Sequence, residues 1–129
     1  MRLALIAGGC AVGFGCDVPA ASAQDVDCSD WRNGTQLVLN VCSGREYEEV
    51  DALLNEQWKR TRSALAADAE QSAMLRDAQR AWITFRDAHC TALTNPNAGG
   101  TIRPLIQNTC LTDLTRQRTE QLRAFANGR

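Results

Sequence analysis

The sequence contains very little of several residue types that common protein functions require. Only one of its 129 residues is His, which excludes sites that need two imidazoles, among them most catalytic zinc centres and two-His iron sites. Lys and Arg number 14 against 15 Asp and Glu, so the formal net charge is −1 and no basic excess attracts nucleic acid. Past the N-terminal region, no stretch approaches the roughly 18 uncharged apolar residues of a membrane-spanning helix. The composition therefore favours one small domain that neither binds nucleic acid nor crosses a bilayer.

The N-terminus has the three parts of a secretory signal. Arg2 is followed by an apolar run and then by a small-residue site that ends at Ala23. We predict that residues 1–23 are cleaved as a signal peptide and that residues 24–129 form one exported domain, periplasmic or secreted. The alternative is a lipoprotein that is anchored to the membrane through Cys16.

Cleavage at this site leaves four of the six cysteines in the exported domain. An even number of cysteines in an oxidising compartment predicts two disulfides. The gaps between them hold 13, 47 and 19 residues, which do not match the short Cys-x(2 to 4)-Cys spacing of zinc sites. Three pairings are possible, and we favour Cys28 with Cys42 and Cys90 with Cys110, because each pair brackets one turn-rich segment.

Apolar residues recur at helical spacing, which predicts an all-α fold, a small disulfide-stapled bundle of three long helices plus one short N-terminal helix. The short helix is expected over residues 36–42 with Thr35 as its cap. A capping box at residues 43–46 predicts that the second helix begins at Ser43 and ends near residues 66–68. The third is expected over residues 72–90, and the last follows a Thr101 cap with Pro104 in its first turn.

The sequence offers few parts for an enzyme. His89 continues an apolar row of the third helix that contains Leu75, Ala78, Trp82 and Phe85, so we interpret it as a packed core residue. Cys90 has no thiolate if it is in a disulfide. We therefore predict no catalytic site, no metal site and no cofactor.

Acidic residues crowd the expected start of the second helix, where the helix dipole favours them. They do not have the spacing of an EF-hand loop, and a solvated helix start explains them better than a calcium or acid–base site. They are Glu46, Glu48, Glu49 and Asp51.

Charge is distributed unevenly along the chain. Residues 24–58 carry eight acidic and two basic side chains, a net charge of −6, whereas residues 59–129 carry eleven basic and six acidic ones, a net charge of +5. One interpretation is an acidic surface that steers a cationic partner. The other is that the two halves neutralise each other within the bundle, for example through Arg86 and Arg118.

Several segments together resemble the LprI-like lysozyme inhibitor family, from about Cys28 to Leu122. The family implies a small exported helical protein with disulfides that binds lysozyme. The residues that carry the resemblance are Leu39-Asn40-Val41-Cys42, Asp51-x-x-Leu54-Asn55-x-x-Trp58, residues 78–90 with Gln79-x-x-Trp82-x-x-x-Arg86-Asp87, Gly99-Gly100-Thr101, Cys110 and Leu114-Thr115-x-x-Arg118-x-x-x-Leu122.

Physical chemistry gives the most specific of these segments a structural role. Gln79, Trp82 and Arg86 are spaced by three and four, so they line one side of a helix. We expect Arg86 to stack on Trp82 and polar partners such as Asp87 to satisfy it, while Arg118 belongs to the same core. These residues are expected to brace a helix interface rather than contact a ligand.

Two functions remain open. In the first, the protein inhibits a lysozyme-type protein: the four acidic residues of Glu46 to Asp51 attract the cationic enzyme, and the loop of residues 96–103, with Asn97 and Arg103, occupies its cleft. In the second, it is a non-catalytic binding or scaffold protein for another cell-envelope component.

Overall fold

The computed structural model describes residues 25–128, and the predicted signal and Cys16 lie outside this range. The described part contains a 3-10 helix, η2 (Trp31–Asn33), then α1 (Gln36–Ala64), α2 (Ala69–Thr94), a second 3-10 helix, η3 (Asn95–Asn97), and α3 (Arg103–Ala126). No strand occurs between residues 25 and 128. The expected all-α class with three long helices and a short N-terminal helical element is confirmed.

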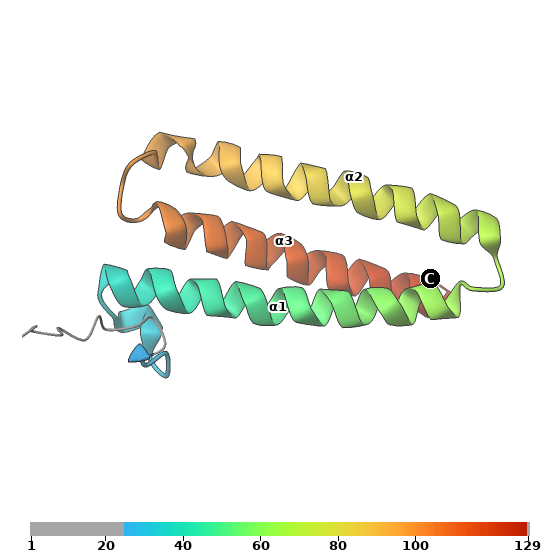
Figure 1. Cartoon of the computed structure of the whole chain (residues 1–129), viewed down its shortest axis with the longest axis horizontal. Helices are drawn as coiled ribbons and strands as arrows, with labels where there is room; N and C mark the ends of the chain where they lie inside the picture. The colour runs from blue at the N-terminus through green and yellow to red at the C-terminus, as the bar shows by residue number, and fades with distance from the viewer. Residues whose placement is uncertain (1–24, 129) are drawn as a thin grey trace, which may run out of the picture.

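The three long helices form an elongated up-down-up bundle (Figure 1). α1 and α3 run in the same direction and pack along most of their lengths, whereas α2 runs the opposite way and packs chiefly on α3. The loop between α2 and α3 and the start of α1 therefore lie at the same end of the bundle, opposite the C-terminus.

The predicted helix break at Ser43 is wrong, because α1 continues through it from Gln36 to Ala64. Thr35 does cap this helix, with its hydroxyl accepting a hydrogen bond from the Val38 amide at 3.4 Å. The Ser43 hydroxyl instead donates to the Asn40 carbonyl and accepts from Asn108 of α3 at 3.1 Å each. Because tertiary contacts occupy the hydroxyl, Ser43 cannot start a new helix.

The other helix ends differ from expectation by a few residues. α2 begins at Ala69, where the Asp68 carboxylate caps the helix by accepting from the Gln71 amide at 2.8 Å, and it ends at Thr94 rather than residue 90. Thr101 does not cap α3, whose N-cap is Ile102 without a side-chain hydrogen bond. The Thr101 carbonyl instead accepts from the Asn40 side chain at 2.8 Å, which ties the interhelical loop to α1.

The apolar core is small, and much of the interior is polar. Leu54, Leu75 and Leu122 form its buried centre, with the half-buried Trp58, Leu65 and Trp82 packed against them. Two fully buried hydroxyls donate to helix carbonyls, Thr61 across the interface to Leu122 at 2.9 Å and Thr94 within α2 to Cys90 at 3.1 Å. Thr112 and Thr115 are also wholly buried, and their hydroxyls have no hydrogen-bond partner among the described residues.

Two disulfides supplement this modest core, in the favoured pairing. Cys28–Cys42 holds the N-terminal segment against α1, and Cys90–Cys110 joins the second half of α2 to α3. Their Cα atoms are 5.6 and 5.7 Å apart, within the usual range for disulfides. Within residues 25–128, no helix combines the length and the apolar character that crossing a bilayer requires.

The inward face of α2 is not the one that apolar spacing predicted. The buried side chains are Leu75, Gln79, Arg86 and Cys90, whereas Phe85 is 54% exposed. His89 is exposed too, and its ring stacks on Phe85 with the ring centroids 5.3 Å apart. The expectation of a core His89 is therefore wrong, because α2 presents polar residues to α1 and α3.

Candidate functional site

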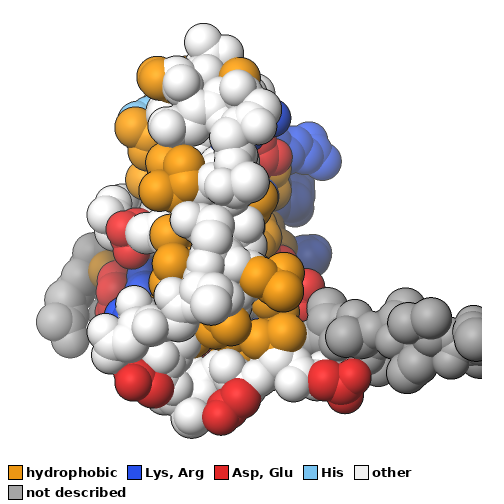
Figure 2. Space-filling model, turned by 90° about the vertical axis from the view of Figure 1, so that its left-hand side faces the viewer, with side chains coloured by type: hydrophobic (Ala, Val, Ile, Leu, Met, Phe, Trp, Pro, Cys, Tyr) orange, Lys and Arg blue, Asp and Glu red, His pale blue; other side chains and the backbone are white. Residues whose placement is uncertain are grey.

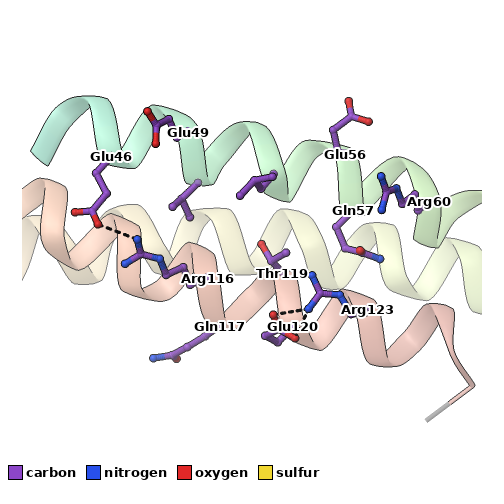
Figure 3. Close-up of a pocket in the computed structure, with 12 residues that line it drawn as sticks. Glu46, Glu49, Glu56, Gln57, Arg60, Arg116, Gln117, Thr119, Glu120 and Arg123 are labelled. Atoms are coloured by element: carbon purple, nitrogen blue, oxygen red, sulfur yellow. Dashed lines mark hydrogen bonds and ion pairs between the residues drawn. The ribbon is translucent and has the colours of Figure 1, made fainter. Parts of the chain in front are cut away.

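An open groove of about 610 Å³ runs between α1 and α3 (Figure 3). Val50 is buried along it and Leu53 is 63% exposed, while charged side chains line its two edges. α2 contributes no lining residue. The groove combines an exposed apolar side chain with charged rims, which suits a protein or peptide segment.

Glu46 closes one end of the groove through two ion pairs. Its carboxylate accepts from Arg116 of α3 at 2.9 Å and from Arg32 of η2 at 3.2 Å. Burial raises the pKa of Glu46, but the hydrogen bonds and charges of the two arginines outweigh it and hold the pKa below its usual value. Glu46 is therefore a structural anion that links three elements.

The four acidic residues Glu46, Glu48, Glu49 and Asp51 lie in the middle part of α1 and do not form one patch. At about 100° per residue, Glu46 and Glu49 face the groove, whereas Glu48 and Asp51 lie on the other side of the helix. Asp51 pairs with Arg86 of α2 at 3.5 Å. Glu48 and Glu49 are exposed, and neither has an ion pair with another described residue. Two of the four carboxylates are thus neutralised within the bundle and two are free, and whether the free ones steer a partner stays a prediction.

The tip of the bundle, defined here as residues 95–103, carries the other predicted contact residues. Asn97 is half-buried, and its carbonyl accepts from the Gly100 amide at 2.9 Å in a turn that Gly99 completes with φ of +80°. Arg103 is exposed and its guanidinium has no ion pair with another described residue. Ile102 beside it is 41% exposed.

The free carboxylates Glu48 and Glu49 lie near the middle of α1, on the half that is nearer the tip. Asn40, which holds the tip, precedes Glu49 by nine residues, a distance of roughly 14 Å along α1. Figure 2 shows the tip's end of the bundle, where acidic side chains lie along the lower edge and apolar side chains are exposed above them. A partner that covers the tip meets Glu48 and Glu49 only if it also extends along α1.

The structure brings the residues of the predicted family core together between the helices. Arg86 lies over the Trp82 ring at 5.1 Å and Arg118 lies over the same ring at 5.9 Å, and both arginines are about nine-tenths buried. Asp87 pairs with Arg86 at 2.9 Å, and Gln79 accepts from Arg118 at 2.8 Å. Desolvation lowers the pKa of Arg118 from its ordinary value.

Sequence reasoning missed two long-range partners of these charged residues. Arg116, which pairs with Glu46, lies 70 residues after it in the chain. Tyr47, whose ring is 5.8 Å from the Arg86 guanidinium, is also far from Arg86 in the chain. Local spacing carries no signal for such long-range pairs. Leu53 in the groove was also missed. Its position four residues after Glu49 places the two side chains on the same face of α1, which was the available signal.

All four described cysteines are in disulfides. Among residues 25–128, no three or more His, Cys, Asp or Glu side chains are placed to hold a metal ion. The surfaces available for recognition are the groove, the free carboxylates and the tip.

One family model and two bacterial proteins are similar to this chain in sequence. The model of a family described as "Lysozyme inhibitor LprI" matches residues 28–122. An uncharacterized protein of Rhizobium meliloti is 33% identical over 120 residues, which cover 84% of this chain and 85% of that protein. The uncharacterized protein YecT of Escherichia coli is 34% identical over 104 residues, which cover 70% of this chain and 64% of YecT. No solved structure matches the chain.

Proposed function

The chain belongs to the LprI lysozyme inhibitor family, and from this premise we propose that it is an exported, non-catalytic protein that binds a lysozyme-type glycosidase and blocks its substrate cleft. The observation that carries the proposal is the tip, where Arg103 and Ile102 are exposed at the narrow end of a bundle that Asn40 and a disulfide keep rigid.

The chemistry of the target fits this tip. Glycosidases of the lysozyme type hydrolyse their substrate with two carboxyl groups in a cleft. A guanidinium can bind such a carboxylate with two parallel hydrogen bonds, and Arg103 has no carboxylate partner among the described residues that would compete. Ile102 would bury apolar area against the cleft wall beside it.

The free carboxylates supply attraction at long range. Glu48 and Glu49 are exposed near the middle of α1, on the half that is nearer the tip, so they would attract a cationic enzyme before contact. Asp51 and Glu46 add less to this field, because arginines neutralise them.

Export agrees with the two disulfides, which persist in oxidising compartments. Signal cleavage after Ala23 would release the domain into the periplasm or medium. Lipidation of Cys16 would instead hold the same domain at the membrane surface.

A lysozyme assay with the purified oxidised protein tests the proposal. The clearing of a peptidoglycan suspension should slow at micromolar protein and low salt, and Arg103→Ala should weaken inhibition by about tenfold or more. Arg76→Ala is the matched control, because Arg76 is an exposed arginine of α2 that has no ion pair with another described residue. Equal loss in both variants would contradict a role for the tip.

Unimpaired clearing with the unmodified protein, at any salt concentration, would reject lysozyme as the partner. A single stoichiometric partner recovered from the cell envelope under those conditions would favour the scaffold function.

A further inference from the structure

α2 carries a long apolar row on a face that no other described helix covers. Its two large members are well exposed, Met74 to 63% and Phe85 to 54%. α2 packs mainly on α3 through another side of the helix, where Gln79 and Cys90 are buried. The row is here named the α2 seam and consists of Gln71, Met74, Ala78, Ala81, Phe85, Ala88 and Ala92 of α2, followed by Asn95, the first residue of η3.

The spacing within the α2 seam is that of a helix–helix contact. Successive members alternate between three and four residues apart, which gives the 3.5-residue period of a coiled coil over more than three heptads. A flat or irregular partner would not require this alternation. The occupant that matches it is another helix of similar length.

We propose that the occupant is α2 of a second copy of this chain, packed antiparallel across the seam. The seam has two kinds of position, those followed by a step of three residues, such as Phe85, and those followed by a step of four, such as Ala81. In an antiparallel pair each kind faces the other, so one register places Phe85 opposite Ala81 of the second copy. The same register places Met74 opposite Ala92. Each large side chain then meets a small one, in the way that well-packed cores alternate large and small residues.

The remaining layers of this register are also compatible. Ala78 faces Ala88 of the second copy, which allows close approach of the two helices. Gln71 and Asn95 face each other at both ends, where their amides can exchange hydrogen bonds at the solvent boundary. A parallel pair would instead set Phe85 against Phe85 and leave Ala81 against Ala81, a mismatch of size.

Charges beside the seam favour the antiparallel pair as well. One flank carries Glu70 and Asp77. In this register Asp77 lies opposite Thr91 of the second copy and Glu70 lies beyond the last layer, so neither opposes another carboxylate. On the other flank lie Trp82 and His89, which have no negative charge. Like charges are therefore not opposed anywhere along the seam.

The size of the contact sets the strength of the dimer. The seam extends over 24 residue steps, roughly 36 Å, and a helix is about 10–12 Å wide, so the interface is at the small end of specific interfaces. The dimer is accordingly expected to dissociate in the micromolar range. It leaves the groove uncovered and involves only Asn95 of each tip, with the two tips at opposite ends of the dimer.

Sedimentation equilibrium of the oxidised protein from low to high micromolar concentration tests the proposal. The unmodified protein should convert from monomer to dimer over this range, and Ala81→Arg should raise the dissociation constant by about tenfold or more, because it places a charge opposite Phe85. Ala52→Arg is the matched control. Both alanines are exposed on a helix, and each follows an acidic residue by four positions, Asp77 and Glu48 respectively.

Exchanging the two residues of the central layer tests the register. Ala81→Phe opposes two rings and Phe85→Ala opposes two small side chains, so each single variant should weaken the dimer. The double variant Ala81→Phe/Phe85→Ala restores one large and one small residue in each layer and should recover dimerisation. Circular dichroism confirms that each variant is folded. A monomeric unmodified protein throughout the range, or a double variant no better than the singles, would overturn the proposal.

Discussion

Gln79 of α2 accepts a hydrogen bond from the Arg118 Nε–H of α3 at 2.8 Å, and both side chains are more than nine-tenths buried. The guanidinium lies against the Trp82 ring, and its Nη1 atom also donates to Gln121 at 3.0 Å. A permanent charge is thus held inside the bundle by neutral acceptors and an aromatic face. Burying a charge in this way is costly unless every partner remains in place.

Removing the acceptor should therefore be more harmful than removing the pair. Gln79→Leu leaves the Arg118 Nε–H buried without a partner, and we expect the free energy of unfolding to fall by about 3 kcal/mol. Gln79→Leu/Arg118→Met replaces both groups by apolar ones and should recover most of that loss. Urea unfolding monitored by circular dichroism measures both. A double variant as unstable as the sum of the two single variants would contradict the explanation.

Glu46 should make stability depend on pH. The pKa of Glu46 is lower in the folded protein than its ordinary value of 4.5, because Arg116 and Arg32 outweigh the effect of burial. A carboxyl group with a depressed folded pKa adds stability above the unfolded pKa and loses it as the pH falls through the folded pKa. Near neutral pH the unmodified protein should therefore be more stable than Glu46→Gln.

The difference in the free energy of unfolding between the unmodified protein and Glu46→Gln should shrink as the pH falls below about 4.5. Arg116→Gln, which removes one partner of Glu46, should also reduce the stability that Glu46 adds near neutral pH. Unfolding curves at a series of pH values give the result. A gap between the unmodified protein and Glu46→Gln that stays constant down to acid pH would show that the ion pairs do not stabilise the fold.

The two disulfides should contribute unequally to the bundle. Cys90–Cys110 closes a 20-residue separation that contains the interhelical loop, so replacing both residues by Ser should lower the free energy of unfolding by about 3 kcal/mol. The Cys28–Cys42 bond ties down a segment outside the three helices, and its removal should cost less and mainly expose that segment to protease. Thermal unfolding and limited proteolysis compare them, and the reverse order of stability would contradict this assignment.

The start of α1 shows where local sequence signals end. Helical spacing predicted the fold class, and cysteine positions predicted the disulfide pairing. The capping-box pattern at Ser43, however, is satisfied by a contact that lies 65 residues away, at Asn108. A local motif cannot reveal that a distant side chain already occupies its hydroxyl.

The inward face of α2 was misread for a related reason. Apolar periodicity selected the row with Phe85 and His89, but the face that packs on the bundle carries Gln79 and Arg86. Polar residues can point inward only because partners 35 and 39 residues away satisfy them. Single-sequence patterns contain no information on such partners, and for the same reason the split of the acidic residues into paired and free ones was not predicted.

The free carboxylates give a last prediction, on the rate at which the protein meets a cationic lysozyme. Glu48→Lys/Glu49→Lys reverses two exposed charges that have no ion pair with described residues, so folding should be unaffected. Association at low ionic strength should slow by about tenfold, and the difference should decline towards 150 mM salt, where the Debye length is about 8 Å. Glu70→Lys/Asp77→Lys makes the same change in net charge on α2 and serves as the control in stopped-flow or surface-binding kinetics. Because steering depends on where charge lies relative to the contact, the control should slow association much less; equal slowing would mean that only net charge matters and that the partner does not approach this part of α1.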